Sequence, residues 1–299
     1  MAASAASNRY RQRLAIDMDF PPPMTTNPPP NDAFRDFERD VHDRLAESYH
    51  QAFTPVTRHA IDPLLDTLAP LQGRRLLDVA TGSGPVAAAA AGRGATTIGV
   101  DLSPRMVELA SRLHPGINFK AADAQRLPFD DAAFDAVVCA FGVGHFPNAE
   151  DALTEWRRVL APGGKVAVSW WDDASRSRIN GIFFDAVTAL GLSLPPTVPS
   201  GPSAFRYSSE DALTALLGGA GFGNVVVNRV ARFHDLPDLD ALWHLARSSF
   251  ARISTLIEAL GDADRALLKT DVESRVIPYR RGARLEIPVS FLVAHGTAP

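Results

Sequence analysis

Residues 76–84 read LLDVATGSG, and residues 99–101 read GVD. In each stretch a run of apolar residues ends in an acid, and a glycine turn and an alanine-rich segment lie between them. This order is typical of an α/β protein that binds a nucleoside, because glycines let the backbone approach the ligand and the second acid binds ribose hydroxyls. The two stretches therefore predict a strand, a tight loop, a helix and a second strand.

The composition is that of an ordinary globular protein. The 299 residues are 46% hydrophobic and 21% charged, which is enough apolar material for a substantial core. The net charge of -4 argues against general nucleic-acid binding, which needs a basic excess or stripe. Cys139 is the one cysteine and is expected to be a small buried apolar residue. No stretch is long and apolar enough to span a bilayer and no secretory leader is visible, so a cytoplasmic protein is the default expectation.

Residues 1–30 are expected to form a disordered tail. Two proline triplets interrupt it, at residues 21–23 and 28–30, and it holds too little apolar surface to offset the entropy of ordering. Met24 is an alternative to Met1 as the first residue, and the sequence does not decide between them.

The folded domain is expected to span residues 31–299 and to be α/β. Apolar residues at helical spacing predict helices over residues 31–70. Strands and helices then alternate through residues 71–171, which predicts right-handed βαβ units in a Rossmann-like, doubly wound sheet. Helical insertions are expected at residues 172–207 and 238–276.

The expected strands are residues 74–80, 96–100, 117–121, 134–140, 165–170, 224–233 and 285–294. The last of these alternates enough to be antiparallel, at a sheet edge or in a hairpin. Residues 161–164, Ala-Pro-Gly-Gly, are expected to close the preceding helix before the fifth strand begins.

The glycine loop alone fits two cofactors. Residues 82–87, GSGPVA, match the dinucleotide fingerprint, so NAD(P) and S-adenosylmethionine both remain open on this motif. Asp78 favours S-adenosylmethionine, because a dinucleotide places an anionic pyrophosphate at that helix N-terminus, where a carboxylate repels it. S-adenosylmethionine instead places a cationic amino group and a sulfonium there. Asp123, after the third strand, can accept a hydrogen bond from an adenine amino group.

Four segments carry a more specific resemblance. They are LLDVATGSG (76–84), GVDLSPRMVELA (99–110), AADAQRLPFDDAAFDAVVCAFGVGHFPN (121–148) and EWRRVLAPGGKVAVSWW (155–171). In order and spacing the chain resembles the class I S-adenosylmethionine-dependent methyltransferases, in the type 11 group around the ubiquinone/menaquinone-biosynthesis C-methyltransferases. Ala80 departs from the pattern, since many members carry glycine there. The resemblance implies a seven-stranded sheet with the last strand antiparallel, S-adenosylmethionine as cofactor, and a helical lid over residues 31–70.

The resemblance also implies which residues contact the cofactor. Gly82 and Gly84 let the loop approach the methionine part, Asp78 stands near its amino group, and Asp101 binds both ribose hydroxyls. The full implied set is Asp78, Ala80, Thr81, Gly82, Gly84, Asp101, Leu102, Met106, Asp123, Ala124, Ala140 and Phe141. The alternative role of Asp101 is a helix-capping acid, and that of Asp123 is a solvated loop acid.

The catalytic residues are harder to predict from the sequence than the cofactor-binding residues. In an in-line methyl transfer the protein mainly positions and desolvates the acceptor, and a general base is needed only when the acceptor loses a proton. His145 is the main candidate base, because it follows the fourth strand at the carboxyl edge of the sheet. Its alternative role is loop packing. Tyr49 is expected to contact the acceptor or cofactor from the lid, or else to be a core aromatic.

Residues 172–207 and 238–276 are expected to set acceptor specificity. They and nearby segments hold aromatic residues that can line an apolar pocket, namely Trp170, Trp171, Phe183, Phe184, Phe205, Tyr207, Trp243 and Phe250. Arginines that can bind an acceptor carboxylate or phosphate are Arg206, Arg247, Arg252, Arg280 and Arg281. A small-molecule acceptor is expected, namely a secondary metabolite, a quinone precursor or a prenyl-type molecule. Residues 139–142, CAFG, stand where nucleic-acid base methyltransferases carry an Asn-Pro-Pro-Tyr-like motif, which argues against nucleic acid.

No metal ligand is predicted, and the sequence leaves open whether carbon, oxygen or nitrogen is methylated. Two other functions also remain open. An NAD(P)-binding oxidoreductase is opposed by Asp78 and by the block at residues 121–170. A protein that binds S-adenosylmethionine without transferring its methyl group stays open because fold and site are separable.

Overall fold

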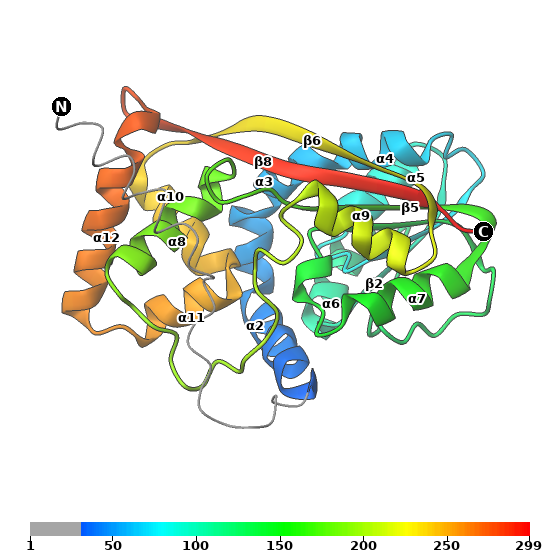
Figure 1. The fold of residues 1–299 in the computed structure, drawn as a ribbon, viewed down its shortest axis with the longest axis horizontal. Coiled ribbons are helices and arrows are strands. Elements are labelled where there is room, and N and C mark those ends of the chain that lie inside the picture. Colours follow the sequence, from blue (N-terminus) through cyan, green and yellow to red (C-terminus); the bar gives the residue numbers. More distant parts are fainter. Residues whose placement is uncertain (1–30) are drawn as a thin grey trace.

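The structure, a computed structural model, describes residues 31–299, so the predicted tail at 1–30 and the alternative start at Met24 lie outside the described residues. One sheet has the strand order β3-β2-β1-β4-β5-β8-β6, and the short β7 pairs with β8. Figure 1 shows the long strands β6 and β8 side by side. Strands β1 to β5 run parallel to one another, and β8 runs antiparallel to β5 and β6. The strands are β1 (Arg75–Val79), β2 (Thr96–Asp101), β3 (Asn118–Ala121), β4 (Phe134–Ala140), β5 (Leu160–Trp171), β6 (Gly223–Leu236), β7 (Arg280–Arg281) and β8 (Arg284–Thr297).

Helices precede, connect and follow these strands. They are α2 (Asn31–Ala52), α3 (Thr54–Thr57), η1 (Arg58–Ala60), α4 (Ile61–Leu68), α5 (Pro85–Gly92), α6 (Pro104–Leu113), η2 (Val143–His145), α7 (Ala149–Val159), α8 (Arg178–Ala189), α9 (Glu210–Gly219), α10 (Leu239–Ser249), α11 (Ala251–Ala259), α12 (Asp262–Val276) and η3 (Ile277–Tyr279). None of the helices within residues 31–299 has both the length and the apolar content to cross a membrane. The predicted α/β, Rossmann-like sheet with an antiparallel last strand is confirmed.

The expected edge position of the last strand is wrong. Strand β8 lies between β5 and β6, and β6 forms the edge of the sheet. Residues 289–294, VSFLVA, are all buried, whereas β6 is largely exposed along its length. A strand covered on both faces carries a continuous apolar run, so residues 289–294 already held the signal for an interior strand. The hairpin expectation is confirmed, because Arg281 of β7 pairs with Arg284 of β8.

Residues 161–164 belong to β5 and not to a closing turn. The Gly163 N–H donates to the Ala298 carbonyl at 3.2 Å, and the Ala298 N–H donates to the Gly164 carbonyl at 2.8 Å. The partner residue, Ala298, lies at the other end of the described chain, so a local sequence pattern could not predict this pairing. The backbone of this proline–glycine segment is satisfied as a strand would be.

Helix α2 joins the sheet to the C-terminal helices. It contacts α6 on one side and α10 and α11 on the other (Figure 1). Phe34, Val41 and Ala46 are buried, and Ala46 packs with Met106 and Leu109 of α6. Burial of this apolar stripe holds α2 beside the ends of β1, β2 and β4, where its polar residues face the cavities described next.

Candidate functional site

Three cavities meet at the carboxyl ends of the parallel strands. The strand-end cavity encloses about 780 Å³, its open mouth included, and is lined by residues that follow β1, β2, β3 and β4. The loop cavity, about 410 Å³, lies against the glycine loop and Asp78. The aromatic cavity, about 750 Å³, lies against β5, α8 and α11. Tyr49 lines all three, so they adjoin at this side chain.

The loop after β1 holds a backbone conformation that favours glycine. Gly82 and Gly84 have φ values of 55° and 82°, and Ala80 has φ of 55°. The left-handed conformation costs a residue with a Cβ about 1–2 kcal/mol, so the backbone of Ala80 is strained. Gly84 lines none of the three cavities. A Cβ there would lie 2.8 Å from Cζ of Phe119, so this glycine serves packing between the loop and β3.

Asp78 ends β1 as a buried carboxylate with one unused oxygen. Its side chain is 1% exposed. Oδ2 accepts hydrogen bonds from Thr81 Oγ1 at 2.6 Å and from the Ala87 N–H at 3.0 Å. Oδ1 is buried and has no hydrogen-bond partner among residues 31–299. Burial raises the pKa of Asp78 to about 7. A cationic amino group in the loop cavity would satisfy Oδ1 and favour the ionised carboxylate.

Asp101 ends β2, where it bonds to the backbone at the start of α6 and also lines the strand-end cavity. Oδ2 accepts from the Gly82 N–H at 2.8 Å, and Oδ1 accepts from the Ser103 N–H at 2.9 Å. The side chain therefore ties the glycine loop to the start of α6, and it also lines the strand-end cavity. Burial raises its pKa, and the two backbone donors oppose that rise. Each oxygen keeps a lone pair that can accept a ribose hydroxyl.

The far end of the strand-end cavity suits a flat apolar ring. Leu102, Met106 and Ala124 line it, and Met106 is fully buried in α6. Asp123 lines the same end, where Oδ1 accepts from the Gln125 N–H at 2.9 Å. Its Oδ2 lies 3.6 Å from Nη1 of Arg35, so Asp123 is a paired loop acid as well as a cavity residue.

The aromatic cavity is walled by rings from distant parts of the chain. Phe141 stacks on Trp171 with ring centroids 4.1 Å apart and an interplanar angle of 23°. Phe184 and Phe205 meet edge to face at 4.7 Å. The remaining aromatic residues of the wall are Tyr49, Phe53, Trp170 and Phe250.

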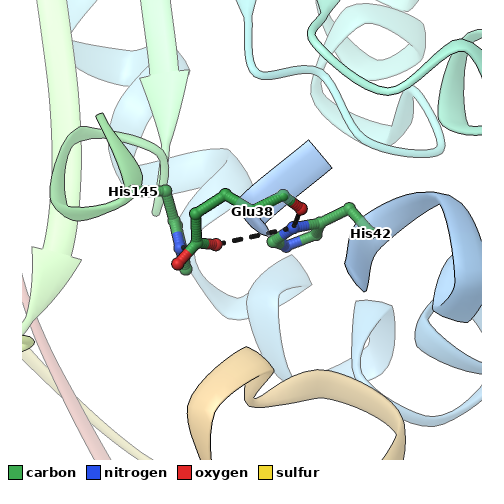
Figure 2. A group of neighbouring side chains, drawn as sticks. All are labelled: Glu38, His42 and His145. Atoms are coloured by element: carbon green, nitrogen blue, oxygen red, sulfur yellow. Dashed lines mark hydrogen bonds and ion pairs between the residues drawn. The ribbon is translucent and has the colours of Figure 1, made fainter. Parts of the chain in front are cut away.

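A carboxylate and two imidazoles lie where the aromatic and strand-end cavities adjoin (Figure 2). His145 Nδ1 donates to Glu38 Oε2 at 3.0 Å, and His42 Nδ1 lies 3.6 Å from the same oxygen. His42 Nδ1 also donates to the Glu38 backbone carbonyl at 2.8 Å. Burial raises the pKa of Glu38, but His145, His42 and Arg252 together bring it below its usual range, so Glu38 is ionised.

This cluster can hold a proton or a metal ion. Its three ligand atoms lie within 4.8 Å of one another, a spacing that one metal ion can bridge. With the His145 proton on Nδ1, the neutral imidazole presents Nε2 as an acceptor. No hydrogen bond reaches that Nε2 from any residue in the described range 31–299.

Tyr49 lies at the centre of the site, and its hydroxyl makes no hydrogen bond to any of residues 31–299. Its ring packs against His42 at 5.9 Å and against Phe53 at 5.3 Å. Burial raises the pKa of its phenol, and the charge of Asp101 raises it further. The phenol therefore stays protonated and can donate a hydrogen bond, so both its packing role and a ligand contact fit its position.

The structure brings the predicted site residues together, with one exception. Those that line the strand-end or loop cavity are Tyr49, Asp78, Ala80, Thr81, Gly82, Asp101, Leu102, Met106, Asp123, Ala124, Ala140, Phe141 and His145. Gly84 lies outside these cavities. The individual contacts of these residues with the cofactor stay predictions.

Sequence reasoning included Tyr49 of α2 but missed the other site side chains that this helix supplies. Glu38 and His42 stand four residues apart and so share one helix face, which is the signal that the sequence offered. Arg35 and Arg39 line the strand-end cavity from the same helix. Of the eight aromatic residues considered for the acceptor pocket, Phe183, Tyr207 and Trp243 do not line the aromatic cavity.

Comparison with known proteins agrees with this geometry. Residues 77–168 match the family described as a methyltransferase domain. The demethylmenaquinone methyltransferase of Clavibacter sepedonicus is 34% identical over 169 residues, which cover 53% of this chain and 69% of the relative. The protein of the same name from Thermus thermophilus is 36% identical over 182 residues, covering 55% of this chain and 80% of the relative.

Solved structures share the fold. A putative methyltransferase of an antibiotic biosynthesis pathway from Anabaena variabilis superposes with a TM-score of 0.56 at 18% identity, covering 79% of this chain and 96% of its own. The Haemonchus contortus phospholethanolamine N-methyltransferase 2, solved with S-adenosylhomocysteine, has a TM-score of 0.53 at 19% identity, covering 89% of this chain and 60% of its own. The expected S-adenosylmethionine cofactor is confirmed, and the NAD(P)-binding alternative is not favoured. The chain thus belongs to the class I S-adenosylmethionine-dependent methyltransferases, in the methyltransferase type 11 group.

Proposed function

We propose that this methyltransferase acts on a small, flat and largely apolar acceptor that binds in the aromatic cavity. One observation carries the proposal: the aromatic cavity shares Glu38, Tyr49, Phe141 and His145 with the strand-end cavity. An acceptor among the rings of the former therefore adjoins the donor in the latter, as in-line transfer requires.

The residues of the strand-end and loop cavities fit S-adenosylmethionine. This cofactor supplies a methyl group on a positively charged sulfur. The unpaired Oδ1 of Asp78 would accept from its amino group, and the Asp101 carboxylate would accept from the ribose hydroxyls. Leu102 and Met106 would pack against adenine, and Asp123 would meet its edge.

His145 is the proposed proton acceptor for an acceptor molecule that carries an acidic O–H or C–H. The hydrogen bond from Nδ1 to Glu38 orients the imidazole and leaves Nε2 to take the proton. The ionised Glu38 stabilises the imidazolium that results. Tyr49, with its protonated hydroxyl between the cavities, is proposed to orient the acceptor by donating a hydrogen bond.

A quinone precursor or similar bicyclic aromatic is the acceptor class that the cavity supports best. About 750 Å³ accommodates a fused two-ring system, and the aromatic walls suit stacking. The two relatives described above carry the name demethylmenaquinone methyltransferase, which points to the same class of acceptor. A secondary metabolite with such a ring system would fit for the same reasons, and a prenyl-type molecule would fit through its apolar surface alone.

A methyl-transfer assay tests this function. The purified chain is incubated with methyl-labelled S-adenosylmethionine and separate acceptors, namely a reduced naphthoquinone, a hydroxynaphthoate, histamine, a peptide and an oligonucleotide. We expect labelled product with one or both bicyclic aromatics and none with the oligonucleotide. Transfer to histamine, the peptide or the oligonucleotide, with none to the aromatics, would contradict the proposal.

A further inference from the structure

Arg252 places a positive charge in the wall of the aromatic cavity. It stands in the first turn of α11, and its Nη2 donates to the Pro202 carbonyl at 2.7 Å. Its guanidinium lies 5.2 Å from the centroid of the Phe34 ring. Burial lowers the pKa of Arg252, and Glu38, which raises it, acts through space without an ion pair. Among residues 31–299, no carboxylate lies in ion-pair range of this guanidinium, and no residue accepts a hydrogen bond from its Nε or Nη1.

The other arginines considered for acceptor binding have different surroundings. Arg206 pairs with Glu150 at 2.5 Å, and Arg280 pairs with Glu273 at 3.2 Å. Arg281 lies 3.4 Å from Glu286, and Arg247 is exposed. The four also line none of the three cavities. Arg252 is therefore the one of the five that combines a place in the cavity wall with guanidinium nitrogens, Nε and Nη1, that have no partner among residues 31–299.

Asn180 is a second polar group in the same wall that lacks a partner. It stands in the first turn of α8, and its side chain is 6% exposed. Its Oδ1 is buried with no hydrogen-bond partner among the described residues, although the residue lines the aromatic cavity. A buried amide oxygen without a hydrogen-bond partner destabilises the protein, and a bound polar group would remove that cost. The amide can turn to present either its N–H groups or its oxygen to a ligand.

We propose that Arg252 and Asn180 form a subsite for an anionic oxygen, so that the acceptor is an aromatic ring bearing a carboxylate or an acidic enol. The N–H groups at Nε and Nη1 of the guanidinium can each donate a charge-assisted hydrogen bond to such an oxygen. The rings of the cavity hold the body of the same molecule. Glu38, the other charge in the wall, is already bonded to His145, so Arg252 supplies the attraction for an anion. This subsite rests on the proposed function, which it deepens by giving the acceptor a charge.

Calorimetry with four probes tests the subsite without any turnover. The chain is saturated with S-adenosylhomocysteine, and binding is measured for 1-naphthoate, 1-naphthamide, 2-hydroxy-1,4-naphthoquinone and 2-methoxy-1,4-naphthoquinone. Each pair keeps the ring and changes the charge, and the two pairs separate a carboxylate from an acidic enol. We expect at least one anion to bind about tenfold or more tightly than its neutral partner, as a charge-assisted contact predicts.

Variants assign that difference to the subsite. Arg252→Met should remove the preference for the anion while neutral probes bind within about twofold, and Arg252→Lys should restore part of it. Asn180→Asp should weaken the anion through repulsion. Arg247→Met, at an exposed arginine just before α11, is the matched control and should change nothing. Circular dichroism and thermal melting establish that each variant is folded.

Three outcomes would overturn the subsite. They are equal binding of anion and neutral partner by the wild-type chain, a preference that survives in folded Arg252→Met, and an equal loss in Arg247→Met. Methyl transfer to aromatics without an anion preference would contradict the subsite but not the proposed function. An anion preference without methyl transfer to aromatics would contradict the proposed function but would still support an anion-binding subsite.

Discussion

His145 Nδ1 lies 3.0 Å from Glu38 Oε2, although the two residues are 107 positions apart in the chain. One follows the central strand β4, and the other projects from α2, so packing of that helix against the sheet brings them together. A buried, ionised carboxylate bonded to an imidazole is an arrangement that orients a general base.

Removing this base should slow methyl transfer without weakening the cofactor. For an acceptor that loses a proton, His145→Ala is expected to lower kcat by about 100-fold or more, within the range of general-base contributions. Glu38→Gln should lower kcat less, because the imidazole remains but loses its ionised partner. Single-turnover rates, with S-adenosylmethionine affinity from calorimetry, check both variants. Unchanged turnover in folded His145→Ala would make the residue a loop-packing residue.

Asp101 should control cofactor affinity. Asp101→Ala removes the proposed ribose contacts and the bonds to the Gly82 and Ser103 N–H groups, so the loop loses its tie to α6. We expect S-adenosylmethionine binding to weaken by about tenfold to a hundredfold. Asp123→Ala, at the half-exposed loop acid, should weaken it less. Calorimetry that finds the same affinity for Asp101→Ala and wild type would contradict the ribose role.

Asp78 should make cofactor affinity depend on pH. Its pKa of about 7 without ligand means that the carboxylate ionises as the pH rises through neutrality. Because only the ionised form pairs with the amino group, affinity for S-adenosylhomocysteine should increase from about pH 6 to pH 8. Asp78→Asn should bind weakly and lose this part of the pH dependence. A dependence that is the same in Asp78→Asn and wild type would place its origin elsewhere.

The same carboxyl group should affect stability in the opposite direction. Its folded pKa lies above the unfolded value, so the folded protein binds the extra proton in the window from about pH 4 to pH 7. The stability contributed by that proton is present at low pH and is lost as the pH rises through this window. The ligand-free wild type should therefore lose stability relative to Asp78→Asn between about pH 4 and pH 7, as followed by urea unfolding. A difference between the two that does not change with pH would contradict this account.

Chelation should leave the enzyme active. In the Glu38–His42–His145 cluster, both imidazole Nδ1 atoms already donate hydrogen bonds, one to the Glu38 carboxylate and one to its backbone carbonyl. The charge of Arg252 also opposes a cation near Glu38. After dialysis against EDTA we expect unchanged turnover and no stoichiometric metal by mass spectrometry. Metal that is retained in a one-to-one ratio, and activity that returns only with it, would make the cluster a metal site.

The cofactor half of the site was predictable because its parts are local. The residues of the glycine loop and the acids at the ends of β1 and β2 follow one another within 26 positions of the sequence, from 76 to 101. Their roles in a strand–loop–helix unit set where they lie. Ser103, two residues after Asp101, is a further local contact: its side chain caps α6 by accepting a hydrogen bond from the Met106 N–H at 3.0 Å.

The acceptor half depended on long-range packing that no local pattern carries. In the sequence, Glu38 looks like an acid on the solvent-exposed face of a helix. It is buried beside His145 because α2 packs against the sheet. The sequence offered no reason to prefer any one of five arginines as the group that binds an acceptor anion. In the structure, three of them form ion pairs with Glu150, Glu273 and Glu286. The interior place of β8 is different, because the apolar run at residues 289–294 already indicated it, and the pairing of β8 with both β5 and β6 shows it.

A crystal structure with S-adenosylhomocysteine and 2-hydroxy-1,4-naphthoquinone tests the central claim most directly. The account predicts the amino group at Asp78, the ribose at Asp101, and the sulfur facing a naphthoquinone ring that lies in the aromatic cavity beside His145. A sulfur that points away from that cavity, or a ring bound elsewhere on the protein, would contradict it.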